Sequence, residues 1–156
     1  VVRVGTRSDY RKSADRRKTV DFGYGLDVVA NAPGRGGQVL VPEAYAKVRF
    51  WPLEVSAGRR REVIGLVDTL LSSGSFTWSG NALPLPRIQV SLPDYWPARG
   101  MIAFKGNFAH GFFENSRPYV KNAFLHQKSL YVRLGRPDGN IRLYGGFVHQ
   151  VMWGGE

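Results

Sequence analysis

The sequence contains no cysteine, which excludes a disulfide framework, a thiolate metal site and a cysteine nucleophile. It also has no apolar run long enough for a transmembrane helix. The stretch from Thr69 to Pro86 is uncharged, but serine, glycine, asparagine and proline interrupt it. No methionine begins the sequence, and both ends lie beside strand-like segments. We therefore expect a fragment of a longer protein.

Acidic residues are scarce relative to basic ones. There are 12 aspartates and glutamates against 22 lysines and arginines, which gives a net charge of +10. An excess of this size favours an anionic partner, and nucleic acid, acidic polysaccharide and lipid head groups all qualify. The alternative is a basic surface that is simply solvated. Composition leaves these alternatives open.

Glycine, proline and aromatic residues are abundant. The 156 residues include 19 glycines and 9 prolines, and 13% are aromatic, a mix typical of many strands and turns. Apolar and polar residues alternate over long segments, as expected for strands. We predict one all-β segment over residues 1–156, an antiparallel meander of about seven strands without helices. The main expected strands are 19–31, 38–51, 54–68, 87–92, 101–113 and the two arms of a hairpin over 129–149, and a charged loop is expected over 7–18.

Alternation does not decide which face of the sheet is buried. In a soluble β-sandwich the apolar side chains would form the core. In an outer-membrane barrel they would contact lipid, and polar side chains would line the lumen. Strands of about ten to thirteen residues are long enough to cross a tilted bilayer. Aromatic residues near the strand ends also favour the barrel, as a girdle at the head groups would. They are Phe50, Trp51, Tyr95, Trp96, Phe112, Phe113 and Trp153.

The last hairpin is expected to turn at Pro137-Asp138-Gly139, a favourable turn sequence. Pairing Leu134 with Ile141 would place Arg133 opposite Arg142. Two arginines directly opposed repel each other, so this register requires a neighbouring carboxylate, a bulge or an anionic ligand. The same register would place His126 opposite His149.

Three longer segments resemble the Wzi-type capsule-assembly family of Gram-negative outer membranes, most of all its Bacteroidetes branch. They are GSFTWSGNALPLPRIQVSLPDYWP (74–97), FKGNFAHGFFENSRPYVKNAFLHQKSLYVRLG (104–135) and GGFVHQVMWGG (145–155). The most specific pieces are SGNALPLP, AFLHQKSLYVR and HQVMWGG. The similarity covers most of the chain from about Lys18 onward.

The resemblance implies an antiparallel outer-membrane barrel of about eighteen strands, with a lectin-like role in attaching capsular or other surface polysaccharide. It implies no catalysis and no cofactor. The expected partners are an acidic polysaccharide, outer-membrane lipid and the remainder of the barrel. The chain departs from the family in lacking its helical plug and in having too few strands, so its sheet would leave two open edges.

Polysaccharide recognition uses aromatic platforms together with polar groups, and arginine binds uronic-acid carboxylates through two parallel hydrogen bonds. Residues of these types lie on the polar side of the expected strands. The candidate binding residues are Tyr45, Lys47, Arg49, Arg87, Gln89, Lys105, Tyr131, Arg133, Arg142 and Tyr144, with Asn107 among them on the same face. The alternative is that they pair with acids such as Asp21, Asp27 and Glu43 and only stiffen the wall. Trp78 is a further candidate for stacking on a sugar.

Catalytic and nucleic-acid functions find less support. The three histidines, His110, His126 and His149, do not have metal-ligand spacing on a helix, so no metal site is predicted. Ser129 and His126 are three residues apart on a strand and point to opposite faces. Interleaved basic and aromatic residues also occur in single-strand-binding folds, but no ribonucleoprotein motif is present and the strands are long for such a barrel.

Overall fold

The computed structural model describes residues 1–10, 20–32, 36–75, 78–115 and 121–155. Eight strands form one antiparallel sheet in the order β1-β2-β3-β4-β7-β8-β9-β10, and the described residues contain no helix. Consecutive neighbours along the sheet are also consecutive along the chain, apart from the short pair β5-β6, so the topology is the predicted meander. The strands are β1 (Val2–Ser8), β2 (Val20–Asn31), β3 (Gln38–Phe50), β4 (Leu53–Arg59), β7 (Arg87–Arg99), β8 (Ile102–Phe112), β9 (Ala123–Leu134) and β10 (Leu143–Gly154).

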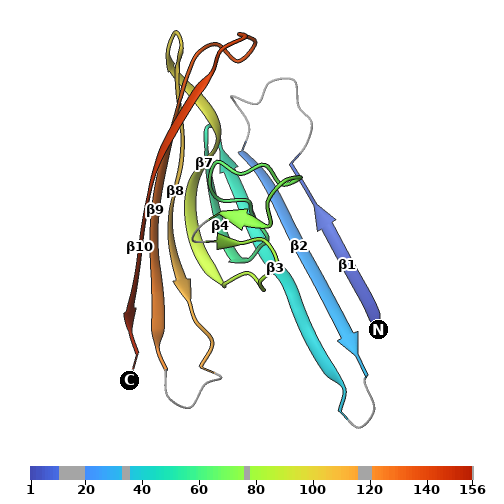
Figure 1. Ribbon diagram of the computed structural model, residues 1–156. Helices are drawn as coiled ribbons and strands as arrows, with labels where there is room; N and C mark the ends of the chain where they lie inside the picture. The colour runs from blue at the N-terminus through green and yellow to red at the C-terminus, as the bar shows by residue number, and fades with distance from the viewer. Residues whose placement is uncertain (11–19, 33–35, 76–77, 116–120, 156) are drawn as a thin grey trace.

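The sheet curves around the connection between β4 and β7, as Figure 1 shows. Within this connection the two-residue strands β5 (Gly74–Ser75) and β6 (Trp78–Ser79) form a small hairpin. We name residues 60–86 the insert. β1 and β10 are the two edges of the sheet, and both chain ends lie at the same end of it (Figure 1). The sheet is therefore all-β and antiparallel, and it is not closed into a barrel over the described residues.

The insert corrects the prediction of one strand over 54–68. β4 ends at Arg59, and the chain then leaves the sheet to cross its polar face. Gly58, next to the end, has a φ of 117°, which favours glycine over residues with a Cβ. A Cβ there would lie 2.2 Å from the Ala44 carbonyl oxygen of β3. The interrupted alternation at Arg59-Arg60-Arg61 thus marks the departure of the chain from the sheet.

The polar face of the sheet is the buried one. Lys47, Glu54 and Gln127 are 4%, 2% and 1% exposed, whereas apolar side chains on the opposite face remain open. Phe22, Ile88 and Leu130 on that face are 67%, 54% and 50% exposed. Leu130 and Leu134 do not pack against a second sheet among the described residues. This is the reverse of a soluble β-sandwich, in which the apolar face is the covered one.

Three details of the strand prediction are wrong. The sheet has eight strands instead of about seven. The stretch from Pro93 to Arg99, left between the expected strands 87–92 and 101–113, continues β7 with irregular pairing to β8. Part of the expected loop over 7–18 is strand, because β1 runs through Ser8. Residues 11–18 of that loop lie outside the described residues.

The last hairpin forms in a different register from the predicted one. Leu134 pairs with Leu143, so Arg133 faces Tyr144 in place of Arg142. The turn at 137–139 is confirmed by a hydrogen bond from the Gly139 amide to the Arg136 carbonyl, 3.1 Å. The loop is two residues longer than predicted, and this removes the expected repulsion between arginines. His126 consequently faces Val151 of β10 and His110 of β8, and not His149.

Aromatic side chains gather at both ends of the strands. At the β3–β4 and β7–β8 turns, the rings of Trp51 and Trp96 lie 5.7 Å apart. At the opposite end of β8, Phe124 lies 5.0 Å from Trp153 and 5.9 Å from Phe112, measured between ring centroids. None of the described residues belongs to a helix long and apolar enough to cross a membrane.

Candidate functional site

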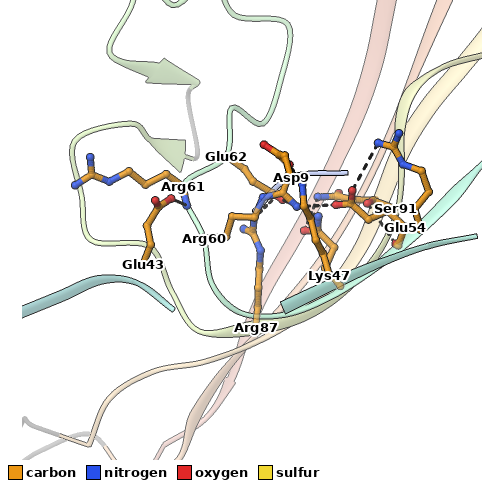
Figure 2. Close-up of polar contacts among 12 residues, drawn as sticks. Asp9, Glu43, Lys47, Glu54, Arg60, Arg61, Glu62, Arg87 and Ser91 are labelled. Atoms are coloured by element: carbon orange, nitrogen blue, oxygen red, sulfur yellow. Dashed lines mark hydrogen bonds and ion pairs between the residues drawn. The ribbon is translucent and has the colours of Figure 1, made fainter. Parts of the chain in front are cut away.

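The polar face carries a network of charges centred on Glu54 of β4. Its carboxylate accepts a hydrogen bond from the Tyr10 hydroxyl at 2.7 Å and another from Arg60 at 2.6 Å. Arg49, its direct partner on β3, lies 3.9 Å away. A carboxylate that is almost fully buried requires such compensation. Figure 2 shows the side chains of the insert and of the sheet meeting at this point.

A second carboxylate, that of Glu62, enters the same network from the insert. Its Oε2 accepts hydrogen bonds from Gln89 at 3.0 Å and from Arg87, and its Oε1 lies 3.1 Å from Arg60. The Trp78 ring lies 4.9 Å from the Arg87 guanidinium. Figure 2 shows Glu62, Arg60 and Arg87 close together. These contacts fix the insert to β7.

The residues that follow β1 complete the network from the other side. The Tyr10 ring lies 4.1 Å from Lys47 and 4.1 Å from Arg49, and Lys47 also pairs with Asp9. The hydrogen bond from Lys47 holds the pKa of Asp9 below its ordinary range. Burial, with a further contribution from Glu54, raises the pKa of the Tyr10 phenol. Burial disfavours the charged Arg60, but Glu62 and Glu54 outweigh it and raise the pKa of that guanidinium.

A second group of basic and aromatic residues lacks acidic partners among the described residues. Lys105 of β8 is the direct partner of Tyr131 on β9, and Arg133 is the direct partner of Tyr144 on β10. The Arg133 guanidinium lies 5.3 Å from the ring of Tyr95, which contacts Tyr144 edge-on at 5.7 Å. The Arg133 Nε and the Tyr95 hydroxyl are buried with no hydrogen-bond partner in the described part of the chain. We call these five residues the uncompensated cluster.

Cavities separate the insert from the sheet. One of about 260 Å³ is lined by Lys105 and Tyr131, and by Arg60 and Glu62 of the insert. A larger one of about 690 Å³ lies between the insert and the strands β9 and β10, and its lining includes Trp78, Leu125 and Gln150. Volumes between about 300 and 1,000 Å³ are usual for ligand sites. The larger cavity is of ligand size, and the smaller borders the uncompensated cluster.

The structure divides the predicted site residues into two groups. Tyr45, Lys47, Arg49, Arg87 and Gln89 lie in or beside the network around Glu54, where Tyr45 contacts Arg60 and the other four contact acids. Lys105, Tyr131, Arg133 and Tyr144 belong to the uncompensated cluster. Asn107 links the strands by donating to Gln89 at 3.2 Å and accepting from Ser129 at 2.5 Å. Arg142 belongs to neither group, because it precedes β10 and donates to the Pro137 carbonyl at 3.0 Å.

Two of the three predicted acids, Asp27 and Glu43, have other partners. Lys47, Arg49 and Arg87 pair with Asp9, Glu54 and Glu62. Asp27 instead binds Arg3 of β1 through two hydrogen bonds of 2.9 and 2.7 Å, and Glu43 accepts the Arg61 backbone amide at 2.9 Å. Sequence reasoning missed Glu54, although it falls on the polar side of its strand by alternation. Glu62 and Tyr10 lie outside the ladder, so no strand period could locate them.

The histidines lie on the apolar face. His110 and His126 are direct partners on β8 and β9, and their ring centroids are 6.4 Å apart. His110 stacks on Phe124 at 5.6 Å and also contacts Trp153. Within the described ranges no group of three or more histidine or acidic side chains could hold a metal ion. The histidines of β8 and β9 therefore belong to the group of aromatic side chains around Phe124 and Trp153 at this end of the strands.

Comparison with protein-family models, with curated proteins and with solved structures found no match to this chain.

Proposed function

We propose that the chain forms part of the wall of an outer-membrane β-barrel that binds an acidic surface polysaccharide on its inner, polar face, as the resemblance to capsule-assembly proteins implies. One observation carries the proposal: the polar face of the sheet is covered, while the apolar face is open. Further strands from outside this sequence would pair with β1 and β10, because sheet edges exposed to lipid would leave backbone hydrogen bonds unmade.

The dimensions of the sheet support a membrane location. Six of the eight strands in the sheet have eleven to thirteen residues. About nine to eleven residues suffice for a strand to cross a tilted bilayer. Aromatic pairs at both strand ends fit the head-group girdles of such barrels. Lys128 opposes this arrangement, since it lies exposed on the apolar face in the middle of β9. Its ammonium lies 5.6 Å from the centre of the Phe108 ring, which offsets part of its cost in lipid.

The uncompensated cluster supports binding of an acidic glycan. Arg133 offers a buried Nε donor with no described partner, and a uronic-acid carboxylate is suited to it. Tyr95 and Tyr144 supply aromatic surface on either side, and Lys105 adds a second positive charge beside Tyr131. Because these cations have no acidic partners in the described part of the chain, a ligand need not break an ion pair there to reach them.

Quenching of tryptophan fluorescence by brominated lipid tests the membrane half of the proposal. Two variants of the whole chain, reconstituted in vesicles, each retain one tryptophan, either Trp153 on the apolar face or Trp78 in the insert. We expect lipid bromine to quench Trp153 strongly and Trp78 weakly. Equal quenching of the two would reject the membrane location.

Binding of oligogalacturonate tests the glycan half. We expect Arg133→Gln and Lys105→Gln to weaken binding at least tenfold, while Arg136→Gln, which removes the same charge from the exposed turn, has less than a twofold effect. A neutral oligosaccharide of equal length should not compete. Equal loss with all three variants, or competition by single-stranded DNA with a steep salt dependence, would favour a general polyanion surface. No binding at all would leave a purely structural wall.

A further inference from the structure

We propose that Arg87, Gln89 and Arg60 form a carboxylate-binding site that is occupied in this structure by Glu62 of the same chain, and that the carboxylate of an acidic sugar replaces Glu62 when the polysaccharide binds. The inference rests on the proposed function and adds to it a second glycan subsite controlled by the insert. Its chemistry is that of a uronic-acid residue within a chain.

Two of the three donors, Gln89 and Arg87, are residues of the sheet that hold their orientation. Gln89 donates to Glu62 at 3.0 Å while its own carbonyl accepts from Asn107 at 3.2 Å. Asn107 in turn accepts from Ser129, so three neighbouring strands fix the direction of the Gln89 amide. Arg87 is 5% exposed and points toward the insert, where it pairs with Glu62. These donors stay in place whichever carboxylate they bind.

Glu62 uses only part of the Arg87 guanidinium. One terminal nitrogen of Arg87 binds Glu62, and the other, NH1, is buried without a hydrogen-bond partner among the described residues. Arginine binds a carboxylate best through two parallel hydrogen bonds. A ligand carboxylate that approaches without the constraint of the insert backbone can use both nitrogens. The unpartnered NH1 therefore favours the external carboxylate over the internal one.

Access and the lack of strand pairing also favour replacement. Glu62 lines three cavities beside the insert, which measure about 690, 260 and 280 Å³. A ligand in any of them reaches its carboxylate. Residues 60–64 belong to no strand, so moving Glu62 breaks side-chain contacts and leaves the backbone ladder of the sheet intact. Displaced from the site, Glu62 would face the water of the cavities.

Two charge-matched variants test the proposal. Glu62→Gln removes the internal carboxylate, and Asp138→Asn makes the same charge change at an exposed residue of the β9–β10 loop that lines none of the three cavities. Affinity for tetragalacturonate is measured with the whole chain in detergent. We expect Glu62→Gln to bind at least tenfold more tightly than the unmodified chain and Asp138→Asn to change affinity less than twofold. If a free carboxylate is sufficient for binding, Glu62→Gln should also bind galacturonate monomer more tightly than the unmodified chain does. Its affinity for the neutral maltotetraose should not rise.

The outcomes separate this inference from the proposed function. If the unmodified chain binds tetragalacturonate and Glu62→Gln binds it equally or more weakly, the internal-competitor role is overturned and the glycan function stands. If neither chain binds, the glycan function fails as well. Should Glu62→Gln not fold, Glu62→Asp decides, because its shorter side chain keeps the charge but reaches the donors poorly. An unchanged affinity in the folded aspartate variant would then overturn the inference.

Discussion

The ring of Tyr131 lies directly over Gly146, its partner in the β9–β10 ladder. A Cβ built on Gly146 would lie 2.2 Å from Cδ1 of Tyr131. Tyr45 and its partner Gly25 repeat the arrangement on the other half of the sheet, with 2.5 Å from such a Cβ to Cε1. Glycine opposite tyrosine lets an aromatic ring lie flat across the neighbouring strand. Two tyrosines of the polar face are thus positioned by the absence of a side chain.

We expect Gly146→Ala to destabilise the protein by about 1–3 kcal/mol, the usual cost of overpacking. The ring of Tyr131 would have to move toward Lys105, so glycan affinity should fall as well. Gly145→Ala is the control, because a Cβ at Gly145 meets nothing within 4 Å. Denaturant unfolding in detergent measures both. Equal effects of the two substitutions would contradict the role of the tyrosine ring.

Removal of the Glu54 carboxylate should be among the most damaging changes in the sheet. Glu54→Ala leaves the buried Tyr10 hydroxyl without its acceptor and removes one of the two carboxylates that pair with Arg60. Breaking a buried ion pair from one side costs about 3–5 kcal/mol. Glu114→Ala, which breaks an exposed pair with Arg59, should cost about 0–1 kcal/mol. The unfolding free energies of the two variants check this, and similar values would show that burial does not govern the network.

The orientation of the apolar face predicts that Lys128→Leu stabilises the chain in a bilayer. A lysine that faces lipid near the bilayer centre costs about 2–4 kcal/mol, and its contact with Phe108 recovers part of this. We expect a gain of about 2 kcal/mol for unfolding from vesicles. Lys121→Leu, at an exposed position before β9, should change the value little. A loss of stability in Lys128→Leu would show that this face contacts something other than lipid.

Acid should weaken the attachment of the segment that follows β1. Lys47 keeps the pKa of Asp9 below its ordinary value of 3.8. A lowered pKa in the folded state means that the pair stabilises the fold fully above the unfolded-state pKa and less as the pH falls through the folded-state pKa. The difference in urea midpoint between the unmodified chain and Asp9→Asn should therefore be constant from about pH 8 to pH 5 and shrink toward pH 3. A difference that grows in acid would contradict the pairing.

Most of the sheet could be predicted from alternation because the side-chain period of a strand is two. Long alternating runs located β2, β3 and β8 to within a few residues, and they divided the polar face correctly from the apolar one. The register of the last hairpin could not be predicted, since the loop is two residues longer than its turn residues indicate. Both registers place the same side chains on the same faces, so the pattern did not distinguish them.

The candidate site was only partly accessible to prediction. Lys105, Tyr131 and Arg133 follow from strand period, and their adjacency follows from antiparallel pairing. The ion pairs of Lys47, Arg49 and Arg87 could not be predicted with the correct acids. Asp9 and Glu62 come from segments without a period, and their positions depend on how the chain crosses the polar face.

The sequence by itself determined an antiparallel sheet with one polar and one apolar face, because alternation is a local property of each strand. Tertiary structure alone decided that the insert covers the polar face and leaves the apolar face open. That choice depends on buried pairs between residues distant in sequence, such as Arg87 with Glu62 and Tyr10 with Glu54. A carboxylate is stable in the interior only where its partners converge, and only the folded chain brings them together.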